Sequence, residues 1–300
     1  MFKQLVQLWM FGPVELGKAL EDLAFTGADG IDLSVTFGEN HNNLAALSGG
    51  RAVNELRKCS LPVEVVTAVY KVPELDFAHP QMEVRETAVR FTTDCIDLAK
   101  LHGAGRVLVS PSYIGSSPRL HTGYSEDWKR AADSLAQAAQ YARENNVRLM
   151  IEPINRYLVS LVHTVAEARR MIDKINSPAL CVVPDVFHMS MEEEGGVIGG
   201  IRDSGRLLEC LHVAENNRTP VSCSGAFDWP TILRELKDIG FEGPLSHEPI
   251  ELYYSENRMS TDAEYRANLL GRISESIKYL RQCMSETGNR QNQSGGEIYK

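Results

Sequence analysis

Short apolar runs alternate with longer amphipathic stretches along most of the chain. After the first run, Leu16, Leu20 and Leu23 recur at spacings of four and three, which places them on one face of a helix. The runs themselves are rich in β-branched residues and are the length of buried strands. We predict eight strands, at residues 5–9, 30–35, 61–66, 106–110, 147–151, 180–183, 210–213 and 244–247.

Helices are predicted between these strands from the same periodicity and from capping residues. Ser125, Thr164 and Asp228 each stand at the start of an amphipathic stretch, and Glu167 follows Thr164 at the capping-box spacing. Glycine closes several of the stretches, as expected at helix carboxyl ends. The predicted helices cover residues 14–24, 44–58, 83–101, 125–145, a stretch after 164, 199–208, 229–239 and 261–283.

Eight strand-helix units in succession predict an α/β fold, a single-domain (β/α)8 TIM barrel. Such barrels typically need about 250 residues, which the 300 residues of this chain supply. The barrel is predicted over residues 1–284, and the polar stretch 285–300 as a C-terminal tail. A doubly wound open sheet is the alternative. The turn at residues 9–13 lacks the glycine-rich phosphate fingerprint of that fold, which favours the barrel.

Ionisable residues stand where four successive apolar runs stop. They are Glu152, Asp185, His212 and Glu248. In a barrel, catalytic groups gather at the carboxyl ends of the strands, and consecutive ends are neighbours. Glu152 and Glu248 each precede a proline, which keeps their backbone extended and ends the strand there. The four side chains are therefore expected to converge.

Three carboxylates brought to one place repel each other unless a cation lies between them. A set of oxygen ligands with one imidazole suits Mn²⁺, Mg²⁺ or Co²⁺ better than a structural zinc site. Each residue alone has an ordinary explanation, such as a solvated loop or a core histidine. Four of them at four successive strand ends favour a site for one divalent metal ion, with Mn²⁺ expected first.

Composition and charge narrow the classes of partner. With 31 Lys and Arg against 40 Asp and Glu, the formal net charge is −9, which disfavours nucleic acid as a partner. No apolar run reaches the roughly 20 residues that span a membrane, and no signal peptide is recognisable. The 6 cysteines form no CxxC pair, and several lie inside apolar runs. Free thiols in a reducing compartment fit this pattern, so we expect a cytoplasmic protein.

Four segments carry a resemblance to a known family. They are residues 151–157, 184–189, 211–218 and 240–249. Their motifs and order resemble the xylose isomerase-like TIM-barrel superfamily, and especially its ketose 3-epimerases, the D-tagatose and D-psicose 3-epimerase group. The likeness covers roughly residues 1 to 284. It implies a small sugar or keto-sugar as substrate and a homodimer or homotetramer as the assembly.

The resemblance also implies roles for individual residues. Residues matching Glu152, Asp185, His212 and Glu248 bind the metal in that family, and those matching the two glutamates also move the proton. Residues matching His188 and Arg218 hold the oxygens of the substrate. The implied reaction is isomerisation or epimerisation through a cis-enediolate, in which two carboxylates act on opposite faces of one carbon. No phosphate-binding motif is evident, which favours a non-phosphorylated sugar.

One position departs from the family pattern. Leu158 stands where the epimerases usually carry a second glutamate that contacts substrate. The change should alter which sugar is held, and a bulkier or more apolar substrate would fit. It also raises the alternative of a lyase on the same scaffold, such as a keto-inositol dehydratase or a 3-keto-glycoside deglycosidase.

Two aromatic residues near strand ends, Trp9 and Tyr70, are further candidates for substrate binding, as the apolar wall of a sugar site. Core packing is the competing interpretation and the more common one for a single aromatic. Two other functions are less consistent with the sequence. A phosphodiester hydrolase resembling the endonuclease IV barrels would need more histidines at strand ends, and the intact Glu152 and Glu248 argue against a catalytically inactive binding module.

Overall fold

A computed structural model gives the structure of residues 1–38, 42–115, 118–250 and 258–294. All the strands found in this part of the chain are parallel and belong to one sheet of eight. The strands are β1 (Gln4–Gln7), β2 (Gly30–Val35), β3 (Val63–Ala68), β4 (Arg106–Val109), β5 (Arg148–Ile151), β6 (Leu180–Val182), β7 (Leu211–Val213) and β8 (Leu245–His247). Each falls on a run predicted as a strand.

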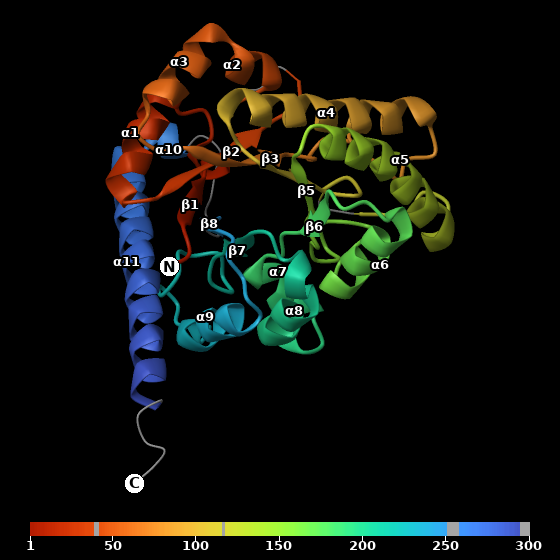
Figure 1. The fold of residues 1–300 in the computed structure, drawn as a ribbon. Coiled ribbons are helices and arrows are strands. Elements are labelled where there is room, and N and C mark those ends of the chain that lie inside the picture. The colour runs from red at the N-terminus through yellow and green to blue at the C-terminus, as the bar shows by residue number, and fades with distance from the viewer. Residues whose placement is uncertain (39–41, 116–117, 251–257, 295–300) are drawn as a thin grey trace.

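Helices follow the strands and surround the sheet (Figure 1). The α-helices are α1 (Leu16–Thr26), α2 (Leu44–Ser48), α3 (Gly50–Lys58), α4 (Met82–His102), α5 (Tyr124–Glu144), α6 (Val165–Ile175), α7 (Val186–Glu192), α8 (Gly196–Ser204), α9 (Trp229–Asp238), α10 (Arg258–Thr261) and α11 (Ala263–Ser294). Two 3-10 helices complete the set, η1 (Leu8–Phe11) and η2 (Gly205–Leu207). The long helix α11 packs beside α1 and α9.

The sheet curls until its first and last strands in sequence are neighbours. Its strand order is β6-β5-β4-β3-β2-β1-β8-β7, with β1 pairing with both β2 and β8. Between β6 and β7, two backbone hydrogen bonds close the ring. The amide of Glu209 donates to the carbonyl of Val182 at 3.0 Å, and the amide of His212 donates to that of Pro184 at 3.0 Å. The predicted (β/α)8 barrel, a single domain, is confirmed.

The barrel interior has an apolar floor. One side chain after another from successive strands contributes to a buried cluster that is separate from the larger core between strands and helices. The cluster consists of Leu5, Val65, Leu108, Met150, Cys181, Val183 and Cys210. Because side chains alternate along a strand, the residue two positions further on points the same way. These next residues are Gln7, Thr67, Ser110, Glu152, Asp185 and His212. An apolar layer thus supports a polar layer at the carboxyl end.

Element boundaries differ from the sequence-based expectation at several places. Strand β1 ends at Gln7 and not at residue 9, because the chain turns into η1 there. The expected single helix over 44–58 is broken, since the backbone of Gly49 is extended between α2 and α3. Ser125 is not a cap: α5 begins one residue earlier, with Gly123 at the N-cap position. Helix α7 was not expected at all.

Two of the expected helix caps are found, whereas the helix predicted over 199–208 is α8 at Gly196–Ser204. Thr164 and Asp228 cap α6 and α9 through their side-chain oxygens, which accept the amide protons of Glu167 and Thr231.

The last helix, α11, continues to Ser294, beyond the expected helix end at Cys283. The domain boundary at residue 284 stays a prediction, and residues 295–300 lie outside the described part. No helix in the described residues has both the length and the apolar character needed to cross a membrane.

Candidate metal centre and active site

Strand geometry brings the four predicted ligands to one end of the barrel. The amide of Glu152 donates to the carbonyl of Val109 at 3.2 Å, and that of Glu248 to the carbonyl of Val213 at 3.1 Å. Each glutamate therefore extends the hydrogen-bond ladder by one residue past its strand. Asp185 follows β6 and caps α7, because its Oδ1 accepts the amide proton of Phe187 at 2.8 Å. Its Oδ2 is on the side of the other three ligands and pairs with Arg218.

The ligand atoms of Glu152, Asp185, His212 and Glu248 all lie within 4.8 Å of one another. Nδ1 of His212 is at the centre of the group, 3.2 Å from Oε1 of Glu152 and 3.2 Å from Oε2 of Glu248. Asp185 and His212 are fully buried, and the two glutamate side chains are only 9% and 14% exposed. In the described residues, this is the one group of three or more potential ligands that could hold a metal ion.

The electrostatics of the group fit a divalent cation. Burial raises the pKa of Glu152 to about 7 and also raises that of Asp185, because a charged carboxylate is costly in a dry site. Burial would lower the pKa of His212, but hydrogen bonding and charge attraction from Glu152 and Glu248 outweigh it and raise that pKa well above its usual value. The group holds more negative charge than its own histidine can balance. Residues with hard oxygen donors and one imidazole suit Mn²⁺, Mg²⁺ or Co²⁺.

Arg218 reaches into the centre from the loop after β7. Its Nη1 is 2.5 Å from Oδ2 of Asp185 and 3.5 Å from Oε2 of Glu248. Burial alone would raise the pKa of Glu248, but the positive charges of Arg218 and His212 outweigh it and lower that pKa to about 2. The backbone of Arg218 is left-handed, with φ of 62°, a conformation that aims the side chain back over the strand ends.

His188 lies on α7 beside this arginine. Nδ2 of Asn155 is 2.8 Å from Nδ1 of His188, while Oδ1 of Asn155 accepts the amide proton of Tyr157. Nε2 of the same ring lies 3.2 Å from Nη2 of Arg218, a group that can only donate. Burial and the charge of Arg218 hold the pKa of His188 well below its usual value, so the ring is neutral. The imidazole of His188 and the guanidinium of Arg218 thus lie side by side next to the carboxylate group.

A family profile described as a xylose isomerase-like TIM barrel matches residues 20–283 of the chain. The chain belongs to the xylose isomerase-like TIM-barrel family. The resemblance seen in the four sequence segments is therefore confirmed at the level of the family.

Named relatives within this family are sugar epimerases. The chain is 31% identical to the D-psicose 3-epimerase of Ruminiclostridium cellulolyticum over 202 residues, which are 66% of this chain and 68% of the relative. It is 30% identical to the 3-dehydro-D-guloside 4-epimerase of Escherichia coli K12 over 133 residues, 44% of this chain and about half (49%) of that protein. The predicted class of enzyme, a sugar isomerase or epimerase, is confirmed.

Solved structures of similar proteins share the whole fold. An L-ribulose 3-epimerase superposes with a TM-score of 0.83, with 20% identity and coverage of 100% of both chains. The D-psicose 3-epimerase of Clostridium cellulolyticum H10, solved with D-tagatose, gives a TM-score of 0.78 at 21% identity and covers 94% of this chain and 99% of its own. At these identities the likeness concerns the barrel alone.

Trp9 and Tyr70, the two aromatic residues predicted to contact substrate, have different environments in the structure. Trp9 lies in η1 at the carboxyl end of β1, is partly exposed, and has the ammonium group of Lys71 4.0 Å from its ring centre. Tyr70 is fully buried, packs against Phe77, and places its hydroxyl 2.6 Å from Oγ1 of Thr92 on α4. Core packing describes Tyr70 well. Substrate contact stays a prediction for both residues.

Sequence reasoning missed three polar residues around the centre. Asn155 orients His188, as described above. Glu215 is fully buried and accepts from the indole of Trp229 at 2.9 Å and the amide of Ser222 at 2.8 Å, which anchors the loop that carries Arg218. Asp32 is fully buried in β2. Its strand alternates polar and apolar residues, as a half-exposed strand does, so no local signal marked Asp32.

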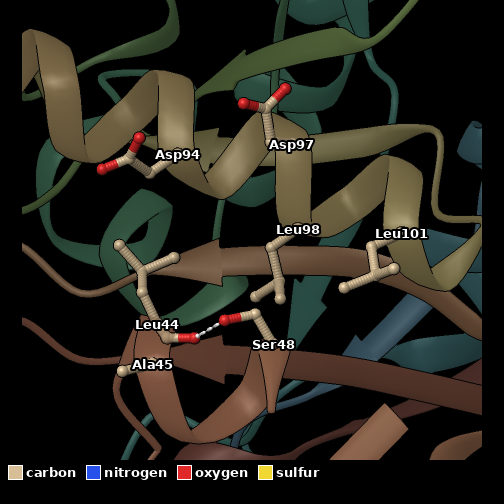
Figure 2. A pocket seen from close by; sticks show the side chains of 7 residues that line it. All are labelled: Leu44, Ala45, Ser48, Asp94, Asp97, Leu98 and Leu101. Carbon is tan, nitrogen blue, oxygen red and sulfur yellow. Dashed lines mark hydrogen bonds between the residues drawn. The ribbon is translucent and has the colours of Figure 1, made fainter. Parts of the chain in front are cut away.

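Two other features lie away from the centre. His247 is the last residue of β8, but its Nε2 lies 2.9 Å from Oε1 of Gln4 and its Nδ1 3.4 Å from Oγ of Ser276 on α11, so it does not add a ligand. The groove in Figure 2 lies between α2 and α4 on the outside of the barrel. It has a volume of about 290 Å³ and is lined by Leu44, Ala45 and Ser48 from α2 and by Asp94, Asp97, Leu98 and Leu101 from α4. Neither feature supports the multi-metal hydrolase weighed from the sequence.

Proposed function

We propose that this protein is a divalent-metal-dependent epimerase of a non-phosphorylated ketose or keto-sugar that works through a cis-enediolate. One observation carries the proposal. Glu152 and Glu248, from β5 and β8, each place a carboxylate oxygen 3.2 Å from the same atom, Nδ1 of His212. Two carboxylates that reach one centre from two strands can act on opposite faces of one substrate carbon.

The proton would pass between these two glutamates and the substrate. One carboxylate removes the proton from the carbon beside the carbonyl, and the other returns a proton on the opposite face, which inverts that carbon. Asp185 and His212 complete the ligand set for the ion. When bound there, a divalent cation polarises the substrate carbonyl and makes the neighbouring C–H bond more acidic.

Arg218 and His188 would stabilise the negative charge that develops on the substrate oxygen. Nη2 of Arg218 lies 3.2 Å from Nε2 of His188, so the two side chains border the same part of the site. A substrate oxygen held there would accept from the guanidinium and from the imidazole in its Nε2-protonated form, and the buried setting would strengthen both hydrogen bonds.

The substrate class follows from the relatives and from Leu158. The relatives named above act on free ketoses and on a 3-dehydro-guloside. Leu158 is half-buried in the loop after β5, where its carbonyl accepts the amide proton of Gly115 at 2.8 Å. An apolar side chain here suits a substrate with a bulky or apolar substituent, so we propose a keto-glycoside or related keto-sugar.

A lyase is the second candidate, and Leu158 is the observation that favours it. The same enediolate can expel a leaving group from the neighbouring carbon in place of taking up a proton. A keto-inositol dehydratase and a 3-keto-glycoside deglycosidase are the two forms considered. Both use the same residues up to the enediolate, so they differ from the epimerase only in the product.

Deuterium exchange separates these candidates. The protein is loaded with Mn²⁺ in D₂O, incubated with a panel of free ketoses and keto-glycosides, and the quenched, metal-stripped products are followed by NMR. Deuterium at the carbon beside the carbonyl, together with a new epimer, is the expected result. Loss of water or of an aglycone would establish the lyase. Absence of exchange with every sugar, in protein that binds metal, would refute the epimerase.

Three further properties belong to the same proposal. Mn²⁺ is the expected ion, with Mg²⁺ and Co²⁺ as alternatives of the same ligand preference. A homodimer or homotetramer is expected from the resemblance to the ketose 3-epimerases. A cytoplasmic location is supported by the six cysteines, all of which are free thiols. Metal analysis of purified protein and light scattering would test the first two.

A further inference from the structure

Asp32 is a buried charge that the catalytic proposal does not use. It lies in the middle of β2, is fully buried, and faces the barrel interior above the apolar floor. Its Oδ1 accepts the hydroxyl proton of Thr67 at 2.7 Å, and its Oδ2 accepts that of Ser246 at 2.7 Å. These contacts fix the carboxylate from β3 and β8.

Two hydroxyl groups do not explain why this residue carries a charge. A neutral amide in the same place would also accept from Thr67, whereas an unpaired carboxylate in a dry interior is costly. Among the described residues, the cationic side chain that comes within 4 Å of Asp32 is His212, whose Nε2 is 3.8 Å from Oδ2. Solvent does not reach Asp32, and this burial raises its pKa.

In the part of the chain that the structure describes, the imidazole of His212 lacks a hydrogen-bond partner on the side that faces Asp32. Its Nδ1 faces Glu152 and Glu248, the side on which the proposed ion would be held. Its Nε2 is buried and has no hydrogen-bond partner among the described residues. An imidazole that gives the lone pair of Nδ1 to a metal must carry its proton on Nε2. That N–H points into a region where Asp32 is the available carboxylate.

We propose that Asp32 is a positioning residue of the metal centre, which holds His212 with Nε2 protonated and Nδ1 free for the ion. A carboxylate behind a ligating histidine fixes the tautomer and ring orientation and makes the ligand nitrogen more basic. Asp32 touches neither substrate nor reacting atoms. It acts through His212, and the hydroxyl groups of Thr67 and Ser246 hold it in place for that purpose.

This inference rests on the metal site of the proposed function but not on its substrate or reaction. Metal affinity is therefore the decisive property, measured with Mn²⁺ alone by the loss of the EPR signal of the free ion. Asp32→Asn keeps the size of the side chain and removes its charge. We expect it to bind Mn²⁺ about 10- to 100-fold more weakly than the natural protein.

Ser34→Ala is the matched control. Ser34 is buried on the same strand and the same interior face as Asp32, two residues further on, and its hydroxyl has no partner among the described residues. This variant should keep the Mn²⁺ affinity. The absorption spectrum of bound Co²⁺ at saturation should change in Asp32→Asn and not in Ser34→Ala, because only the first loosens a ligand.

A measurement on the natural protein covers the case in which Asp32→Asn does not fold. With ¹⁵N-imidazole labelling of the 8 histidines and Mg²⁺ bound, His212 should show a slowly exchanging, strongly downfield Nε2 proton. An unprotonated Nε2, or an unchanged Mn²⁺ affinity in folded Asp32→Asn, would overturn the role of Asp32 alone. Metal binding without sugar exchange would instead refute the epimerase and leave this inference standing.

Discussion

The two ends of the barrel both carry clusters of charged residues, but only one cluster is balanced. At the amino end, Glu209 pairs with Arg106 at 3.0 Å and with Arg148 at 3.2 Å, and Glu64 pairs with Lys3 and Arg106. These side chains are partly exposed, so water shares in their solvation. Every carboxylate in this cluster has a cationic partner, and the cluster can do little beyond stabilising the fold.

At the carboxyl end, carboxylates outnumber cations in a buried site. Glu152, Asp185 and Glu248 share His212 and Arg218, and burial raises the pKa of two of the three acids. A metal ion resolves this imbalance. The comparison teaches that imbalance and burial together, and not charge density alone, mark the functional end of this barrel.

The largest effect is expected from neutralising either catalytic glutamate. Glu152→Gln and Glu248→Gln keep the shape of the side chain but remove a proton acceptor, so kcat for deuterium exchange should fall by about 10²- to 10⁴-fold. Thermal unfolding should change little in Glu152→Gln, because burial raises the pKa of Glu152, whereas Glu248→Gln also loses the attraction of Arg218 and His212 and should melt at a lower temperature. Near-normal exchange in either variant would remove that glutamate from the mechanism.

Removing the metal should be the next largest effect. An ion that binds only the folded chain stabilises it by about 2.7 kcal/mol at one hundred times its dissociation constant. Chelation should therefore lower the melting temperature of the natural protein. A melting temperature that is the same with chelator and with saturating Mn²⁺ would contradict an ion at this end.

Breaking the balanced cluster at the amino end should lower the free energy of unfolding and leave metal binding unchanged. Glu209→Gln removes the partner of Arg106 and Arg148, and half-exposed pairs of this kind contribute about 1 kcal/mol or less. Denaturant unfolding should show this loss, while Mn²⁺ affinity and exchange rate stay at their natural values. If the variant lost metal binding, the two ends would not be independent.

The ion pair of His163 and Glu167 also lies at the carboxyl end of the barrel, but its charges are balanced. It therefore tests whether charge balance or position in the barrel decides what a cluster does. Burial alone would lower the pKa of His163, but its hydrogen bonds and its attraction to Glu167 outweigh burial and raise that pKa above 6.5. Burial alone would raise the pKa of Glu167, but hydrogen bonds from His163 and Tyr124 outweigh burial and lower that pKa to about 2. The contribution of His163 to the free energy of unfolding is complete below pH 6.5 and is lost as the pH rises through the pKa of His163 in the folded chain. The contribution of Glu167 to the same free energy is complete above pH 4.5 and is lost as the pH falls toward 2.

His163→Gln should therefore lower the melting temperature most between pH 4.5 and pH 6.5, by a small amount, and should leave Mn²⁺ binding intact. Melting curves of both proteins across this pH range provide the check. A difference that grows steadily above pH 7 would show that the pair does not stabilise the chain in its charged form.

Most of the barrel could be predicted from the chain because apolar periodicity changes sharply between strands and helices. The four ligands were accessible for a related reason. Each stands where an apolar run stops, and a proline after Glu152 and Glu248 marks the strand end. Helix α7 is not recognisable from the sequence because it has only 7 residues and its cap, Asp185, also fits the pattern of a metal ligand.

The remaining site residues depend on three-dimensional contacts that no local pattern encodes. Asp32 and Ser34 alternate with apolar residues as the outer face of a half-exposed strand does, and only barrel closure buries both faces. The pairing of Arg218 with Asp185 depends on a left-handed backbone in a loop. Asn155 is recognisable only once α7 places His188 beside it.

The central claim is that the unbalanced carboxyl end holds one divalent ion. Mn²⁺ titration of the natural protein beside Asp185→Asn, followed by EPR, tests it most directly. Because Asp185 gives one oxygen to α7 and the other to the site, the variant keeps the helix cap and loses a charged ligand. We predict one tightly bound ion per chain in the natural protein and much weaker binding in the variant. Equal binding by both, or no binding by either, would contradict the account.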